Sequence, residues 1–255
     1  MRLAAYFVFA LGLSLGVLPA CRQDAPAPTT SPAGITGQVL AFDQQATAQP
    51  LSAADITVTV LDLTPTVTTT TNAAGEFALP QLPAGTYNLR FSRPGLSSFY
   101  LRGIRHPDAA QPTPLPERYL LYAEPDVQAT ALRATTTAGT ISLDMTLRSP
   151  QPTIVFRYAL YLSDSPTVSF ATAPLLQQGG AGSLAPGTVQ HIDLTFSRSQ
   201  LVQAGAHFAA GTTVYVVAHG AGLRGLLYTD LATGQRQTWP SLNLLPSPVA
   251  SFTMP

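Results

Sequence analysis

The sequence predicts an all-β protein of two tandem antiparallel β-sandwiches that follow a cleaved helical signal peptide. Three observations lead to this prediction. Short runs rich in Val, Thr, Ile and aromatic residues alternate apolar and polar side chains, which is the period of a strand with one buried face. Turn residues separate the runs, with 19 Gly and 23 Pro in 255 residues. Beyond residue 20, no long stretch repeats its apolar residues with the 3.6-residue period of a helix.

The first twenty residues have the pattern of a secretory signal. Arg2 supplies a positive charge, and residues 3–17 are almost wholly apolar. The run of about 15 residues is shorter than the roughly 20 that a membrane-spanning helix needs. It leads into Leu18-Pro19-Ala20-Cys21, which resembles the lipobox of bacterial lipoproteins. The resemblance implies cleavage after residue 20, lipidation of Cys21 and attachment to the membrane through that lipid.

Residues 21–33 are predicted to form a flexible tether. Prolines among Ala, Thr and Ser favour extended, solvated backbone. At about 3.1 Å per residue this segment would reach roughly 35 to 40 Å from the membrane. Arg22 stands where lipoproteins retained at the inner membrane of enteric bacteria have Asp, so we expect the outer membrane as the location. These residues leave open whether the protein faces the periplasm or the cell exterior.

Composition bounds the partners. Beyond residue 20 the chain has 12 Arg, no Lys and 13 acidic residues, a net charge near −1. Such a balance does not attract nucleic acid, and we expect no nucleic-acid partner. The 235 residues after the signal are enough for two domains, and Cys21 is the only cysteine, so the cores must be stable without a disulfide.

The first sandwich is expected over residues 34–105. In residues 56–60 the apolar side chains alternate with threonines, so one face packs and the other meets water. Gly75 and Gly85 are expected to take positive φ in turns before strands. The predicted strands are residues 35–42, 56–61, 67–71, 76–79, 86–91 and 99–104.

Several motifs of this segment resemble one known family. They are Gly37-Gln38-Val39, Gly75-Glu76-Phe77, Pro83-Ala84-Gly85-Thr86-Tyr87 and Gly95. In this order they resemble the carboxypeptidase regulatory-like domain, a transthyretin-like β-sandwich of the carbohydrate-binding-like fold group. That family is an accessory domain of peptidases and many other proteins, so the resemblance implies no peptidase activity here.

Residues 106–117 are predicted to be a proline-rich linker, because four prolines interrupt the strand pattern. We therefore expect the two sandwiches to fold independently. The second is expected over residues 118–255, where residues 211–220 resemble the F strand of a fibronectin type III-like, immunoglobulin-like sandwich. Residues 200–204 are expected to form a single helical turn. The predicted strands are residues 127–133, 140–147, 154–163, 168–171, 189–196, 212–219, 226–230 and 249–254.

No motif in the sequence points to a catalytic, cofactor-binding or metal site. The four histidines, His106, His191, His207 and His219, lack partners at metal-ligand spacing, and no Gly-x-Ser-x-Gly elbow occurs. The glycine-rich residues 179–182 lack the lysine of a phosphate-binding loop and are expected to be a flexible loop.

The sequence therefore predicts a membrane-anchored envelope lipoprotein that acts as a non-catalytic binding or structural module, without cofactors. Its expected partners are the membrane, through the lipid on Cys21, and a glycan or an envelope protein. One alternative is a carbohydrate-binding lipoprotein of a polysaccharide-handling system, with Tyr119, Tyr122 and Trp239 as a stacking platform. The competing role for these aromatics is to fasten loops to the sandwich. Another alternative is a hydrolase whose cleft joins a carboxylate to His191 or His219.

Overall fold

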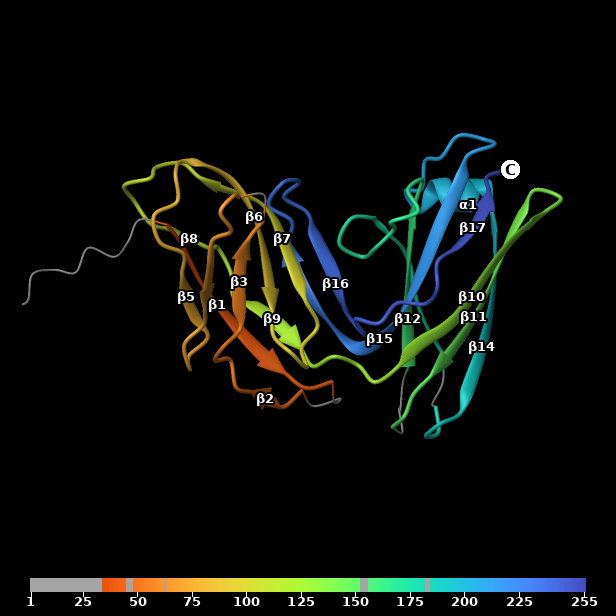
Figure 1. The fold of residues 1–255 in the computed structure, drawn as a ribbon, viewed down its shortest axis with the longest axis horizontal. Coiled ribbons are helices and arrows are strands. Elements are labelled where there is room, and N and C mark those ends of the chain that lie inside the picture. The colour runs from red at the N-terminus through yellow and green to blue at the C-terminus, as the bar shows by residue number, and fades with distance from the viewer. Residues whose placement is uncertain (1–33, 45–47, 62, 152–155, 182–183) are drawn as a thin grey trace, which may run out of the picture. The chain divides into compact units, whose positions relative to one another are not determined.

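The computed structural model describes residues 34–44, 48–61, 63–151, 156–181 and 184–255, which fold almost entirely into strands (Figure 1). The prediction of an all-β fold is confirmed. One short helix occurs in this part of the chain, α1 (Arg198–Gln203), and it lies where a single helical turn was expected. No helix of the described residues is long and apolar enough to span a membrane. The predicted signal, Cys21 and the tether lie outside the described residues.

Two sheets form the first sandwich. One is antiparallel, in the order β4 (Thr68–Thr70), β3 (Thr57–Val60), β6 (Gly85–Ser92) and β7 (Phe99–His106). The other has β1 (Ile35–Phe42) at its centre, between β2 (Pro50–Leu51) and β5 (Glu76–Ala78) in the strand order. Strand β1 has the predicted boundaries, and its buried residues, Ile35, Val39 and Ala41, all lie on one face.

The proline-rich segment differs from the expected linker, because it adds strands to the first sandwich. Both β8 (Thr113–Pro114) and β9 (Tyr119–Tyr122) pair in parallel with β1. The prolines are tolerated because they alternate with donors: Thr113 donates its N–H to the Gly34 carbonyl at 2.7 Å, and Leu115 donates to Thr36 at 2.8 Å. His106, also expected in the linker, is fully buried, with Nδ1 2.7 Å from Thr113 Oγ1.

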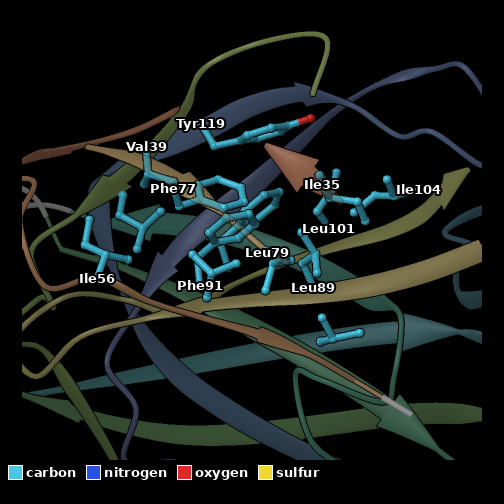
Figure 2. Packing of buried hydrophobic residues seen from close by; sticks show 14 of the residues in the cluster. Ile35, Val39, Ile56, Phe77, Leu79, Leu89, Phe91, Leu101, Ile104 and Tyr119 are labelled. Atoms are coloured by element: carbon cyan, nitrogen blue, oxygen red, sulfur yellow. The ribbon is translucent and has the colours of Figure 1, made fainter. Parts of the chain in front are cut away.

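Aromatic rings fill the centre of the first core. Tyr119 stacks on Phe91 at 5.9 Å and on Phe99 at 5.4 Å between ring centroids. Figure 2 shows Tyr119 lying across the phenylalanine rings with aliphatic residues of both sheets around them. Because Tyr119 is fully buried, β9 is part of this core.

The second sandwich also has two sheets. One is β10 (Gln128–Thr137), β11 (Thr140–Arg148) and β14 (Val189–Ser197). In the other, β12 (Phe156–Ser163) lies between β13 (Leu175–Ala181) and β15 (Thr213–Thr229), and β15 also pairs with β16 (Arg236–Leu242) and β17 (Ala250–Thr253). A core of mainly aliphatic residues, which also contains Phe156, Tyr158 and Phe252, lies between the two sheets.

Two predictions in this part were wrong. Gly179, expected in a flexible loop, lies in β13 opposite Tyr158, and a Cβ at Gly179 would come within 2.2 Å of the Tyr158 hydroxyl oxygen. Only a glycine fits there without displacing the tyrosine. Residues 168–171, expected as a strand, lie in the loop between β12 and β13, whose backbone is folded by a turn at Ser169.

Strand β15 joins the two sandwiches. It was expected as two separate strands, but it runs through 17 residues, and its second half forms a hairpin with β16 (Figure 1). Leu226 and Tyr228 of this hairpin are buried in the core of the first sandwich, and Trp239 packs against that core. Residues 32–255 accordingly form one compact unit.

Buried hydrogen bonds reinforce this connection. The Ser97 hydroxyl lies 2.9 Å from the Ser241 hydroxyl and donates to the Leu242 carbonyl at 2.9 Å. Asn243 donates its side-chain N–H to the Pro125 carbonyl at 2.7 Å. The bonds of Ser97 persist only while the end of β16 stays on the first sandwich, so separating the two would leave these buried groups without their partners.

The turns at Gly75 and Gly85 of the first sandwich differ in whether they require glycine. Gly75 has a φ of +77°, and a Cβ there would meet the Val39 carbonyl oxygen at 1.8 Å. Gly85 lies outside the left-handed region, so the expectation of positive φ there is wrong. Its strand β6 begins at Gly85 itself, one residue earlier than predicted, and extended backbone does not require glycine.

Candidate functional site

The second sandwich contains a preformed cavity of about 320 Å³. It lies between the end of β12, the loop that connects β12 to β13, and the turn that follows α1. Its volume falls at the lower end of the range for small-molecule sites, roughly 300 to 1,000 Å³. We therefore take it as the candidate ligand site.

Apolar and polar groups share the lining of the cavity. Leu162, Pro174, Leu176 and Phe208 provide apolar surface. Polar groups come from the hydroxyls of Ser163 and Thr172 and from the exposed, ionisable side chains of Asp164 and His207. Such a lining can pack against the apolar face of a ring while hydrogen-bonding its polar substituents.

Local hydrogen bonds hold the turn after α1 in place. The helix begins with a capping box, in which Ser197 accepts from the Gln200 N–H and the Gln200 side chain accepts from the Ser197 N–H. After the helix, Ala206 donates its N–H to the Leu201 carbonyl at 2.9 Å, and Gly205 takes a φ of +89°. The segment that carries His207 and Phe208 is thus fixed at its base.

The loop between β12 and β13 is also ordered by its own polar groups. Ser163 accepts a hydrogen bond from the Ser165 N–H at 3.0 Å. Further along, Ala173 donates its N–H to the Ser169 carbonyl at 2.9 Å, and the Ser169 and Thr172 hydroxyls lie 2.9 Å apart. This turn presents Thr172, Ala173 and Pro174 to the cavity.

The three aromatics of the predicted stacking platform do not form one surface. Tyr119 is fully buried, so no face of its ring can meet a ligand. Burial and the charge of Glu117 raise the pKa of its hydroxyl. Tyr122 is partly buried with its ring 6.2 Å from Phe42. Trp239 donates its indole N–H to the Ser98 carbonyl at 2.9 Å and packs edge-on against Phe99.

A different aromatic cluster, which the sequence did not reveal, surrounds Phe170 in the loop between β12 and β13. Its ring lies 5.9 Å from Tyr100, 6.4 Å from Trp239 and 5.2 Å from His219. Tyr100 belongs to β7 of the first sandwich, so the cluster connects the loop to both sandwiches. Tyr100 and Phe170 are far apart in the sequence, and no local pattern marks them as neighbours.

The other histidines lie on separate strands, His106 on β7, His191 on β14 and His219 on β15. His219 is buried beside Tyr161 and Phe170. This burial lowers the pKa of its imidazole, and the opposing effect of the hydrogen bond to the Asn243 carbonyl, 2.8 Å away, is smaller. His191 lies exposed on β14, 3.3 Å from the Thr146 hydroxyl. Within the described part of the chain, no group of three His, Cys, Asp or Glu residues could hold a metal ion.

A second hollow lies over β1 of the first sandwich and is more open to solvent. It has a volume of about 500 Å³ and is lined by residues of β1, β5 and the segment between β8 and β9. Glu117 at its rim is already bound to Arg236, with 2.9 Å between the carboxylate oxygen and the guanidinium nitrogen. The cavity of the second sandwich is the better enclosed of the two.

Comparison with known proteins confirms the resemblance of the first sandwich. Residues 34–115 match the family model of the carboxypeptidase regulatory-like domain. The molecule is thus an all-β sandwich protein that carries such a domain at the N-terminal end of its described part. No curated protein matches the chain.

Among solved structures, the chain is similar to a candidate carbohydrate-binding protein from Bacteroides uniformis ATCC 8492. The two are 13% identical with a TM-score of 0.35, over 87% of this chain and 99% of that one. It is also similar to a DUF3823 family protein from Parabacteroides merdae ATCC 43184, at 15% identity and a TM-score of 0.30, over 88% of this chain and 100% of that one.

Proposed function

We propose that this protein is an outer-membrane lipoprotein whose joined sandwiches form a non-catalytic binding module, with the cavity of the second sandwich as its ligand site. The observation that carries the proposal is the cavity of about 320 Å³, whose two walls are turns held by their own hydrogen bonds. A site that is formed before the ligand arrives does not lose binding free energy to ordering its loops.

The proposed anchor rests on the sequence. The apolar run before Leu18-Pro19-Ala20-Cys21 supports export and lipidation of Cys21, and Arg22 supports delivery to the outer membrane. A diacylglycerol with an additional acyl chain supplies several buried chains, at about 0.8 kcal/mol for each buried methylene, which is enough for stable attachment.

We also propose that the second sandwich is fibronectin type III-like. Seven strands in two facing sheets support this assignment: β10, β11 and β14 in one, and β13, β12, β15 and β17 in the other. The tethered module would then consist of a regulatory-like domain followed by a fibronectin-like domain, a pairing suited to presenting a binding site away from the membrane.

A second candidate is carbohydrate binding, and the chemistry of the cavity favours it. Phe208 and Leu176 offer apolar surface for the face of a sugar ring. Asp164, His207 and Thr172 can hydrogen-bond its hydroxyls. A glycan bound in this way would need no aromatic platform at Tyr119 or Trp239.

A glycan array probed with the fluorescently labelled protein tests this candidate. Asp164→Asn should weaken binding of a captured glycan about tenfold, because hydrogen bonds to a charged group are stronger than those to a neutral one. His207→Ala should also weaken it, whereas His191→Ala is the matched control, an exposed histidine that does not line the cavity. Binding that is unchanged in both cavity variants would exclude the cavity as the glycan site.

Trp239→Ala is a weaker test of the same candidate. The indole packs against Phe99 and Tyr100 and hydrogen-bonds Ser98, so its removal also disturbs the first core. A loss of glycan binding in this variant implicates Trp239 only if the melting temperature stays that of the wild type.

A further inference from the structure

One side of the loop between β12 and β13 forms a wall of the cavity, and the other side contacts the first sandwich. Arg102 of β7 donates a hydrogen bond from its guanidinium to the Ala171 carbonyl. The same guanidinium lies over the Tyr100 ring, 5.9 Å from its centroid. The next residue in the loop, Thr172, lines the cavity.

Phe170 provides a second attachment of this loop. Its ring packs in the cluster formed with Tyr100, Trp239 and His219, edge to face in each case. Tyr100 comes from β7 and Trp239 from the hairpin that covers the first core. Residues 170 and 171 are therefore held by groups that belong to, or are packed on, the first sandwich.

A displacement at these two residues must reach the cavity, because the loop is tightly turned here. Ala173 donates to the Ser169 carbonyl at 2.9 Å, so Phe170 and Ala171 lie inside a hydrogen-bonded turn that ends at the cavity wall. The turn cannot move at Ala171 and remain in place at Thr172 and Ala173.

We propose that the regulatory-like sandwich positions the wall of the ligand cavity in its neighbour, with Arg102 and Phe170 as the positioning residues. The inference rests on the proposed function only in taking the cavity as a ligand site. It gives the first sandwich a role in binding although none of its residues lines the cavity. The width of the site, and hence its selectivity, would then depend on the contact between Arg102 and Ala171.

Amide hydrogen exchange, followed by mass spectrometry on the full chain in detergent, tests the positioning. Arg102→Ala should speed exchange in residues 169–174 about three- to tenfold, since it removes one charge-assisted hydrogen bond. Arg105→Ala is the matched control: Arg105 is an exposed arginine three residues further along β7, and it does not contact the loop in any described hydrogen bond. Exchange in that variant should equal the wild type.

Two further variants separate positioning from a general loss of stability. Arg102→Lys should restore most of the protection, because an ammonium can also donate to the Ala171 carbonyl. Phe170→Ala should speed exchange in the same residues by about tenfold or more, while exchange in β11 and β12 stays unchanged. A uniform increase across the second sandwich would instead mean destabilisation and would overturn the proposal.

The glycan array, repeated with Arg102→Ala, links the loop to binding. Weaker capture of a glycan that His207→Ala also weakens supports the proposal. If the wild type captures no glycan but the exchange results are as expected, the positioning stands and the carbohydrate candidate fails. Unchanged exchange in both Arg102→Ala and Phe170→Ala overturns the positioning whatever the array shows.

Discussion

Replacing Tyr228 on strand β15 should destabilise the first sandwich, although this residue lies more than 100 positions beyond it in the sequence. Its side chain is 6% exposed, and its ring meets Phe99 edge to face, 5.0 Å between centroids. Truncating a buried aromatic residue to alanine costs about 3 to 5 kcal/mol, so we take about 3 to 4 kcal/mol for Tyr228→Ala. For a protein of this size the melting temperature should fall by about 6 to 16 °C.

The adjacent residue provides the control. Leu227 is 56% exposed, and Leu227→Ala should change stability by no more than about 0.5 kcal/mol. Thermal unfolding followed by circular dichroism compares the two variants, and hydrogen exchange in β6 and β7 locates the change. Equal melting temperatures, or unaltered exchange in β6 and β7 of Tyr228→Ala, would refute the claim that the hairpin belongs to the first core.

Four other predictions concern Gly75, Tyr119 and Cys21. Gly75→Ala should lower the free energy of unfolding by about 2 to 4 kcal/mol, because it combines a left-handed φ with a clash at the Val39 carbonyl. Gly85→Ala should change it by less than about 1 kcal/mol, and urea titration compares the two variants. Tyr119→Phe should raise the melting temperature, because the Tyr119 hydroxyl is buried without a hydrogen-bond partner among the described residues. The pKa of the Tyr119 hydroxyl is raised in the folded state, so the stability that is present below about pH 10 is lost as the pH rises further. In Tyr119→Phe the free energy of unfolding should therefore fall less steeply with rising pH in this alkaline range. Cys21→Ser should abolish the incorporation of an alkyne fatty acid in cells; equal labelling of variant and wild type would contradict lipidation at this residue.

The contacts of Tyr228 also change what we expect of separated fragments. The proline pattern alone favours two sandwiches that fold independently. A fragment of residues 34–105, however, lacks Tyr119, Leu226 and Tyr228, all buried in its core. We now expect that fragment to melt without a cooperative transition, and a cooperative melt equal to that of the whole chain would restore the original expectation.

Much of the fold could be predicted because local alternation determines strands that have one wet face. Strand β1 was predicted at both boundaries for that reason, and so was the turn that ends at Gly75. Strands β8 and β13 were missed because their composition argues against them locally. The pairing of β8 depends on donors placed between prolines, and β13 depends on a glycine that makes room for Tyr158. In both cases the pairing depends on residues of the partner strand, and these cannot be recognised from the local sequence.

The candidate site was less predictable than the fold. Its lining comes from three segments that are separate in the sequence, and only their packing brings Ser163, Thr172 and His207 to one cavity. At the level of the sequence, His207 is set aside with the other histidines, because it has no partner at metal-ligand spacing. Tyr119 misled because a short strand between prolines resembles a loop, whereas its burial depends on pairing with β1.

Strand β15 explains why the ligand cavity and the regulatory-like domain should be treated as one unit. Its first half pairs with β12, from which the cavity loop departs, and its second half pairs with β16, which carries Trp239 to the first core. A continuous strand transmits displacement better than a flexible linker, since ladder hydrogen bonds fix its backbone on both sides of the irregularity between Ala221 and Gly225. His219, in the middle of β15, contacts Phe170 of the cavity loop. The loop between β12 and β13 therefore contacts both β15, which joins the two sandwiches, and the first sandwich itself.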